Sequence, residues 1–440
     1  MALIEEFRRH LSRLALPSGR AVVAVSGGLD SMALLDLLLR TDDVHGLELI
    51  VAHADHGIAP ESATVAARVR ERAAALGLPC EVGELHLGAV AGETPARIAR
   101  YLWLAAVREH AQASCIITAH HADDQAETVL MRALKGSGPA GLAGMAAISG
   151  VLIRPLLPFR REDLARYVRE RELPVWLDPA NHNPRHLRSW IRCDVLPPLR
   201  RRLPAIDANL LRVARQAGID RAAWDAALAL LPGLDFRREP DAFSVAGPVL
   251  AGYDSSLAVT LIMAAARRAG TQVGLARAQR VLDLARAGIS GSEVPLARGW
   301  KAELSFGRLR LVPPQVFTVR APWTLAGDRG EGQWGSWRIR WRREAAPERQ
   351  EASALTAWFS DDGLTVRGWE PGERVRPLAR LGRRRVVRCF QEARVPSSQR
   401  PDWPILARQD DVIWIPGVCR SDALLPAPGT EALRVDAEHA

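Results

Sequence analysis

The residues with the clearest chemistry form the stretch SGGLDS at positions 26–31. It follows an apolar, β-branched run (21–25) and leads into a helix-like pattern (30–40). Its two glycines let the backbone approach an anion without a Cβ in the way. The free N–H groups and the positive end of the following helix attract that anion. Because the lysine of a Walker loop and a GxGxxG pattern are both missing, the stretch predicts a different kind of phosphate site.

Asp30 lies inside this phosphate loop, where a carboxylate would repel phosphate. Its position makes sense if a divalent cation lies between the two, since hard cations prefer oxygen ligands. We therefore predict that Asp30 binds Mg²⁺. The alternative is a helix N-terminus after a glycine turn, with Asp30 stabilising the first turn.

A second acidic group lies in HHADDQAET at 120–128. Asp124 and Glu127 are three residues apart on a predicted helix, so both project from one face. They are predicted to hold an ammonium group or a magnesium-bound water. The alternative is an acidic first turn that complements the helix dipole, for which Asp123 alone would suffice. The two histidines are candidates for moving protons.

Strand-like and helix-like segments alternate through the first part of the chain, which predicts an α/β fold with a mostly parallel sheet. Ligands bind beyond the carboxyl ends of such strands, and both motifs follow strands. The predicted strands are 21–25, 47–53, 80–86, 114–120 and 151–157, and the predicted helices are 30–40, 63–76, 95–110, 123–134 and 161–171.

Three domains are expected. The first covers 1–205, and the second, at 206–350, is helical and then strand-rich, with strand-like pieces at 301–312 and 334–344. A linker at 345–354 precedes a small basic α+β domain at 355–425.

The charge balance favours a polyanionic partner. The 440 residues include 59 basic and 50 acidic side chains, and all but two of the basic ones are arginines. Arginine suits phosphate, although codon bias would also explain the excess. Five cysteines without a CxxC pair argue against a disulfide framework or a zinc site and favour a reducing cytoplasm. No apolar run reaches the length of a membrane span.

SGGLDS resembles the PP-loop of the N-type ATP pyrophosphatases. That resemblance implies an adenine-nucleotide α-hydrolase-like fold and cleavage of ATP between the α and β phosphates. Further segments resemble the tRNA(Ile)-lysidine synthetase family: VAHADHGI (51–58), ETPARIARY (93–101), TAHHADDQAETVLMRALKGSGPAGLAGM (118–145), LDPAN (177–181) and RSWIR (188–192). The C-terminal stretch at 367–406 resembles the tRNA-binding domain of that family.

The resemblance implies an enzyme, a C–N bond-forming ligase that uses ATP and Mg²⁺. The wobble cytidine of the CAU anticodon of tRNA(Ile) would be adenylated, and free L-lysine would then displace AMP to give lysidine. The modified anticodon would read AUA instead of AUG. The oligomeric state, monomer or homodimer, stays open.

The resemblance also implies roles for single residues. Arg97 is expected at the α-phosphate or the lysine carboxylate, and Ala52 or His53 at the adenine through the main chain. Arg192 ends RSWIR, a segment that departs from the family pattern at Ser189. The residues expected to be catalytic are Asp30, Arg97, Asp124, Glu127 and Arg192, and those expected to bind ATP are Ser26, Gly27, Gly28, Leu29, Asp30, Ser31, Ala52 and His53. The residues expected to bind lysine are Asp124, Glu127 and Arg97. The residues expected to bind tRNA are Arg374, Arg376, Arg383, Arg384, Arg385 and Arg388.

Two alternatives remain open. A thiolase-like PP-loop enzyme would need cysteines to deliver sulfur, and no CxxC occurs. A non-catalytic tRNA-binding protein would keep the fold without releasing pyrophosphate. Pyrophosphate release distinguishes the second alternative, and the identity of the incorporated group distinguishes the first.

Overall fold

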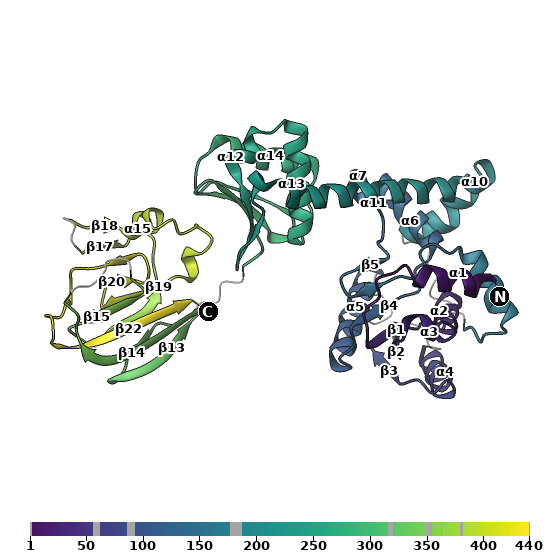
Figure 1. The fold of residues 1–440 in the computed structure, drawn as a ribbon, viewed down its shortest axis with the longest axis horizontal. Helices are drawn as coiled ribbons and strands as arrows, with labels where there is room; N and C mark the ends of the chain where they lie inside the picture. The colour runs from purple at the N-terminus through teal and green to yellow at the C-terminus, as the bar shows by residue number, and fades with distance from the viewer. Residues whose placement is uncertain are drawn as a thin grey trace. The chain divides into compact units, whose positions relative to one another are not determined.

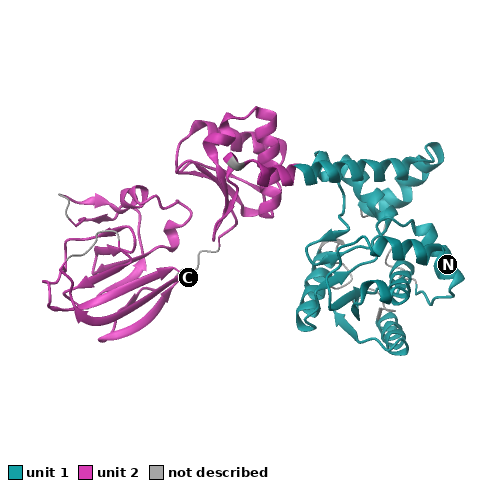
Figure 2. Ribbon diagram, viewed as in Figure 1, with its two compact units in different colours: residues 1–223 teal, residues 224–440 magenta. Residues whose placement is uncertain are grey.

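The computed structural model describes residues 2–55, 62–85, 93–176, 187–315, 320–348, 354–361, 363–378 and 382–439. The chain forms two compact units, 1–223 and 224–440, which are described separately (Figure 2). Among the described residues, no helix combines the length and apolarity needed to cross a membrane. LDPAN and part of VAHADHGI lie outside the described residues.

The first unit is built on a six-stranded sheet in the order β3-β2-β1-β4-β6-β5 (Figure 1). All neighbours are parallel except the β5–β6 pair, which confirms the predicted mostly parallel α/β fold. The strands are β1 (Arg20–Ala24), β2 (Glu48–Asp55), β3 (Cys80–Glu84), β4 (Cys115–Ile117), β5 (Ile148–Ser149) and β6 (Leu152–Ile153).

Helices precede, connect and follow these strands. They are α1 (Ala2–Leu11), α2 (Leu29–Leu39), α3 (Asp42–His45), α4 (Ser62–Ala75), α5 (Glu93–His110), α6 (Ala122–Leu134), α7 (Pro139–Leu142), α8 (Arg161–Glu170), α9 (Leu187–Trp190), α10 (Leu196–Arg202) and α11 (Ile206–Leu230). A π-helical turn, Ile191–Val195, joins α9 to α10. The predicted strand at 151–157 is much shorter than expected, because Pro155 has no N–H to continue the ladder.

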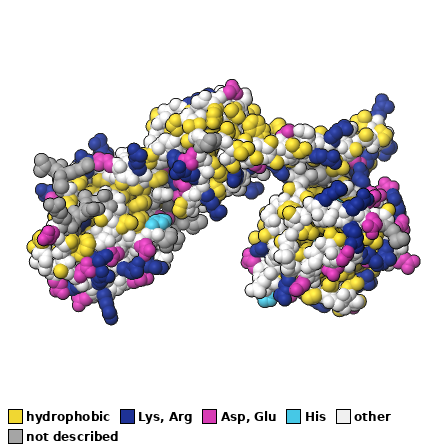
Figure 3. Space-filling model, viewed as in Figure 1, with side chains coloured by type: hydrophobic (Ala, Val, Ile, Leu, Met, Phe, Trp, Pro, Cys, Tyr) yellow, Lys and Arg dark blue, Asp and Glu magenta, His cyan; other side chains and the backbone are white. Residues whose placement is uncertain are grey.

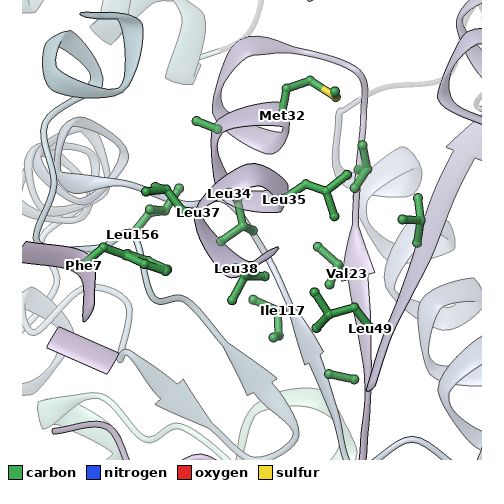
Figure 4. Close-up of a cluster of buried hydrophobic side chains, with 14 of the residues drawn as sticks. Phe7, Val23, Met32, Leu34, Leu35, Leu37, Leu38, Leu49, Ile117 and Leu156 are labelled. Carbon is green, nitrogen blue, oxygen red and sulfur yellow. The ribbon is translucent and has the colours of Figure 1, made fainter. Parts of the chain in front are cut away.

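Helix α2 anchors the core of this unit. Its leucines Leu34, Leu37 and Leu38 are fully buried, and they pack among Val23 of β1 and Phe7 of α1 (Figure 4). A helix that is apolar on most of its faces is stable only when it is enclosed. The packing of α2 therefore fixes the position of the loop that precedes it, which is SGGLDS.

The second unit begins with a helical layer on an antiparallel sheet in the order β7-β8-β11-β10-β9. Helices α13 and α14 share a core with β10 and β11. The elements are β7 (Arg237–Arg238), β8 (Phe243–Ala246), α12 (Gly247–Gly252), α13 (Ser255–Ala269), α14 (Leu275–Ala287), β9 (Glu293–Pro295), β10 (Lys301–Ser305) and β11 (Arg308–Val312).

The last part of the chain contains two antiparallel sheets with a common core, in the orders β12-β16-β19-β20-β21 and β13-β14-β22-β15. The elements are β12 (Trp323–Thr324), β13 (Arg329–Trp334), β14 (Trp337–Ala345), β15 (Thr356–Phe359), β16 (Thr365–Gly368), β17 (Arg374–Val375), β18 (Arg384–Arg385), α15 (Val386–Glu392), β19 (Pro404–Arg408), β20 (Asp411–Ile415), β21 (Cys419–Arg420) and β22 (Glu431–His439).

Strand pairing here differs from the expected boundaries of the second and third domains. The β14 strand pairs with β22 along nine residue pairs, from Trp337↔His439 to Ala345↔Glu431. Strands from the expected second domain thus complete the sheet of the expected third domain, which extends past 425. The segment 334–344 also contains a hairpin turn at Gly335, where φ is +59°, rather than one continuous strand. Antiparallel partners so far apart in sequence leave no local signal.

Candidate active site

The SGGLDS loop turns between the end of β1 and the start of α2. Gly27 has a φ of +81°, and a Cβ there would lie 3.0 Å from both Trp176 and Val65, so only glycine fits. The Ser31 hydroxyl donates to the Gly28 carbonyl at 2.9 Å and accepts from the Ser26 N–H at 3.1 Å. The serine hydroxyls therefore hold the turn together. Within the described part of the chain, the N-cap residue Gly28 makes no side-chain capping bond to α2, so the first N–H groups of this helix are open to an external acceptor.

Strand β2 ends beside this loop. The Ala52 carbonyl accepts from the Val25 N–H at 2.9 Å, and the buried His53 ring lies with Nδ1 2.8 Å from the Val25 carbonyl. Burial lowers the pKa of His53, so its ring is neutral at physiological pH. These bonds tie the ends of two adjacent strands and keep the loop at the carboxyl edge of the sheet.

Asp30 faces His121, the N-cap residue of α6. Nε2 of His121 lies 3.7 Å from Asp30 Oδ2 and 3.3 Å from Asp124 Oδ2. Burial opposes charge on both groups, but their mutual attraction outweighs it. The pKa of His121 is therefore raised by Asp30 and Asp124, and the pKa of Asp30 is lowered by His121, Arg161 and Arg192.

The second oxygen of Asp30 has no hydrogen-bond partner among the described residues. Oδ1 is buried, and its nearest ion-pair partner, Nε of Arg161, is 3.7 Å away. An ionised oxygen without a hydrogen bond, beside N–H groups open to an acceptor, suits a cation shared with phosphate oxygens. Mg²⁺ is commonly bound in this way, through one or two carboxylates and substrate phosphates. The residues present fit Mg²⁺.

Asp124 and Glu127 are both buried on α6 and are bridged by two arginines from the segment RSWIR. Arg188 donates to Asp124 at 2.8 Å and to Glu127 at 2.9 Å. Arg192 donates to Glu127 at 2.6 Å and 2.9 Å, and to Asp124 at 3.2 Å. The hydrogen bond to Glu127 raises the pKa of Arg192 further. The predicted carboxylate pair and Arg192 thus share one cluster with Arg188, in which two carboxylates face two guanidinium groups.

Asp123, the neighbouring acid, has a different role. It accepts from Arg160 Nη2 at 2.8 Å and from the backbone N–H of Arg161 at 2.9 Å. Arg160 also bonds Asp207 at 2.8 Å, so this network joins α6, α8 and α11. Asp123 therefore stabilises the framework, while Asp124 and Glu127 belong to the site.

Arg97 approaches the site from α5. Its guanidinium lies over the ring of Tyr101, 5.1 Å from the centroid. His120, whose ring bonds the Thr118 hydroxyl at 3.0 Å, has its pKa lowered to about 2 by burial and then by arginines that include Arg188 and Arg97. His120 is therefore a neutral group beside the arginines, whereas its neighbour His121 faces the carboxylates. The sequence did not distinguish the two histidines.

Two contacts to the site were missing from the sequence-based set. Arg161 lies beside Asp30, and Arg188 bridges the carboxylate pair. A signal existed for Arg161, which begins a helix after a strand and so lies at the ligand-binding edge of the sheet. Arg188 is four residues before Arg192, a spacing that puts both on one helical face.

The basic hairpin of the second unit, formed by β17 and β18, carries several predicted tRNA contacts. Arg374 lies directly opposite Arg385 across the two strands. Like charges in this position repel one another, unless an anion lies between them. Their neighbours are partly neutralised, since Arg383 pairs with Asp411 at 3.4 Å and Arg384 with Glu392 at 2.6 Å. The other predicted contacts, Arg376 and Arg388, are exposed, and Arg376 pairs with Asp422 at 2.9 Å.

Comparisons with known proteins agree with this geometry. Residues 3–199 match the model of the PP-loop domain, and residues 364–437 match that of the TilS substrate C-terminal domain. The tRNA(Ile)-lysidine synthase of Alkalilimnicola ehrlichii is 35% identical, over 97% of this chain and 95% of that protein. The proteins of that name from Symbiobacterium thermophilum and Geobacter sulfurreducens are each 30% identical, over 99% and 95% of this chain and 98% and 93% of theirs.

The α/β fold and its SGGLDS loop define the chain as a PP-loop enzyme that uses ATP. Because the similarity extends over nearly the full length at 30–35% identity, the family is clear. The chain belongs to the tRNA(Ile)-lysidine synthase family, whose members are ligases of tRNA processing.

Proposed function

We propose that this enzyme attaches the ε-amine of free L-lysine to C2 of the wobble cytidine in the CAU anticodon of tRNA(Ile). In the first step, O2 of the cytidine attacks the α-phosphate of ATP, and pyrophosphate leaves. In the second step, the lysine amine attacks C2, a proton leaves the nitrogen, and the C2–O2 bond breaks to release AMP. The product is lysidine, which changes codon reading from AUG to AUA.

The observation that carries this proposal is the carboxylate pair Asp124–Glu127 next to the phosphate loop. Both side chains are buried, at 8% and 3% exposure, and they already hold two cationic groups. A lysine ammonium is a cation of the kind this pair binds. Its arrival would release a guanidinium of Arg188 or Arg192, which could then turn to the α-phosphate.

The phosphate loop accounts for the first step. The open N–H groups at the start of α2 would bind the departing pyrophosphate, and Ser26 and Ser31 would keep the turn rigid. Asp30 would hold Mg²⁺, which supplies charge neutralisation on the phosphates when it is bound. His121 and Arg161 position the Asp30 carboxylate. Ala52 and His53, in the second half of β2, would face the adenine.

Arg97 and His120 would serve the lysine end of the site. Arg97 would bind the lysine carboxylate, since it lies on α5 close enough to His120 to lower its pKa. His120, whose pKa burial and these arginines lower to about 2, would stay neutral while the amine attacks, so it would act there as a hydrogen-bonding group, and the proton that the amine releases would pass to solvent. The basic hairpin would hold the tRNA backbone through phosphate contacts that carry little sequence information.

The decisive test supplies the purified enzyme with ATP, Mg²⁺, labelled lysine and tRNA bearing a CAU anticodon. The expected result is tRNA-dependent release of pyrophosphate and label in the tRNA. Incorporation of sulfur instead of lysine would favour the thiolase-like alternative. Binding of tRNA without any pyrophosphate release would favour the non-catalytic one.

A further inference from the structure

Helix α9 presents two different faces beside the carboxylate pair. Arg188 turns toward Asp124 and Glu127. Leu187 and Trp190 are three residues apart, so they share another face, where they are 38% and 43% exposed. The next residue, Ile191, is completely buried, so this segment packs against the first unit. Trp190 is exposed because its side chain points away from that packed face.

The helix following Trp190 is unusual in two respects. It passes through a π-helical turn, Ile191–Val195, a conformation that is rare and often found at functional sites. It then ends in three successive arginines. Arg200 is bonded to Asp207, whereas Arg201 and Arg202 are exposed and have no ion pair within the described part of the chain. Figure 3 shows Lys and Arg side chains over the part of the first unit where α10 lies in Figure 1.

We propose that Trp190, supported by Leu187, is a stacking platform for an unpaired nucleobase next to the wobble cytidine, and that Arg201 and Arg202 bind the adjoining phosphates. This inference rests on the proposed function. For O2 of the cytidine to reach the ATP site, the wobble base must leave the stack of the anticodon loop, and α9 lies next to that site through Arg188. Unstacked bases are commonly held on aromatic side chains.

The chemistry of the surface favours RNA as the occupant. An exposed tryptophan accepts any base on its π face, and guanidinium groups on the same segment complement the phosphate backbone. A protein partner would meet, further along the same helical segment, the exposed Arg201 and Arg202, which have no ion pair within the described residues and so favour an acidic partner. Continuity with the carboxylate pair through Arg188 and Arg192 places the platform at the edge of the reaction site itself.

The test compares Trp190→Ala and Trp190→Phe with a matched control, Ile219→Ala, which changes an exposed apolar residue (58%) on α11. We expect Trp190→Ala to raise KM for tRNA roughly 5- to 160-fold, as converted from the stacking energy of one base. Trp190→Phe should recover most of that loss, and Ile219→Ala should behave as wild type. KM for ATP and the midpoint of thermal unfolding should stay unchanged in all three.

A second measurement uses an RNA hairpin with a CAU loop as the probe. Its affinity should fall for Trp190→Ala, and the double variant Arg201→Gln/Arg202→Gln should lower the slope of log affinity against log salt by about 1 to 2. Unchanged hairpin binding in Trp190→Ala would overturn the proposal. So would a tryptophan-dependent dimer in solution, which would make a second copy the occupant. If wild type binds the hairpin through Trp190 but incorporates no lysine, the proposed function fails and the platform stands.

Discussion

Arginine serves two regions of this molecule in opposite ways. In the first unit, Arg188 and Arg192 bridge two buried carboxylates at distances of 2.6–3.2 Å. In the second unit, Arg374 and Arg385 face each other across two short strands and are exposed. The first arrangement is neutral and geometrically fixed, whereas the second concentrates positive charge at the surface.

The difference shows that partners and burial, rather than residue type, decide what a guanidinium does. In a buried cluster each charge depends on the others, because removing one leaves its partner unpaired. On a surface the charges act nearly independently and are screened by salt. A single substitution in the first region should therefore cause a large loss of activity. Substitutions in the second region should weaken tRNA binding gradually, by an amount that depends on salt.

The largest effect is expected for Asp30→Asn. The amide has the same shape but no charge with which to hold Mg²⁺, so pyrophosphate release should fall on the order of 100-fold or more. The fold should persist, as judged by an unchanged circular dichroism spectrum. Asp42→Asn, an exposed acid on α3, is the control. Near-normal pyrophosphate release in Asp30→Asn would remove Asp30 from the mechanism.

Glu127→Gln tests whether the carboxylate pair forms the binding site for lysine. Loss of one buried charge should reduce lysine incorporation on the order of 100-fold, because it leaves the opposite charges of a desolvated cluster unpaired. ATP binding, which uses the loop, should change little. Glu109→Gln on α5, whose side chain is 72% exposed, is the matched control. Equal losses in lysine incorporation and ATP binding would contradict a lysine-binding site that is separate from the ATP site.

Neutralising the basic hairpin should give a smaller, graded effect. The triple variant Arg383→Gln/Arg384→Gln/Arg385→Gln should weaken tRNA binding on the order of 10-fold at moderate salt and lower the salt slope by about 2 to 3. ATP binding should be unaffected. The matched control neutralises Arg338, Arg340 and Arg342 on β14, each about half exposed and paired with an acid. If the control weakens tRNA binding equally, net charge matters rather than the hairpin.

The smallest effect concerns pH and His121. Burial opposes its charge, but Asp30 and Asp124 raise its pKa above the ordinary value of 6.5. A raised pKa in the folded state stabilises the fold fully below pH 6.5, and this contribution is lost as pH rises through the folded pKa. Asparagine keeps the helix cap but cannot be protonated.

The free energy of unfolding should therefore fall more steeply with rising pH for wild type than for His121→Asn. Denaturant titrations from pH 6 upward measure this difference, with the exposed His110→Asn as the control. A difference between wild type and His121→Asn that is constant with pH would mean that the imidazole is not charged in the fold. The buried cluster would then contain one charge fewer than its geometry indicates.

The sequence alone was enough to predict the features that depend on a local pattern of residues. Alternating apolar runs predicted the parallel sheet, and the two glycines of SGGLDS predicted the phosphate turn, because backbone conformation and periodicity are encoded by neighbouring residues. The placement of both motifs at the carboxyl edge followed from the topology of such sheets. The three-residue spacing of Asp124 and Glu127 likewise predicted that they project from one face of α6, where Arg188 bonds both of them.

Only the tertiary structure decided which charges meet. It separated Asp123, which is bonded to Arg160, from Asp124, which is bonded to Arg188 and Arg192, and it gave the adjacent histidines His120 and His121 opposite electrostatic surroundings. It also joined β14 to β22 across the expected domain boundary. Ion pairs and antiparallel strand partners are set by distances in space between residues tens of positions apart, and no local pattern records them.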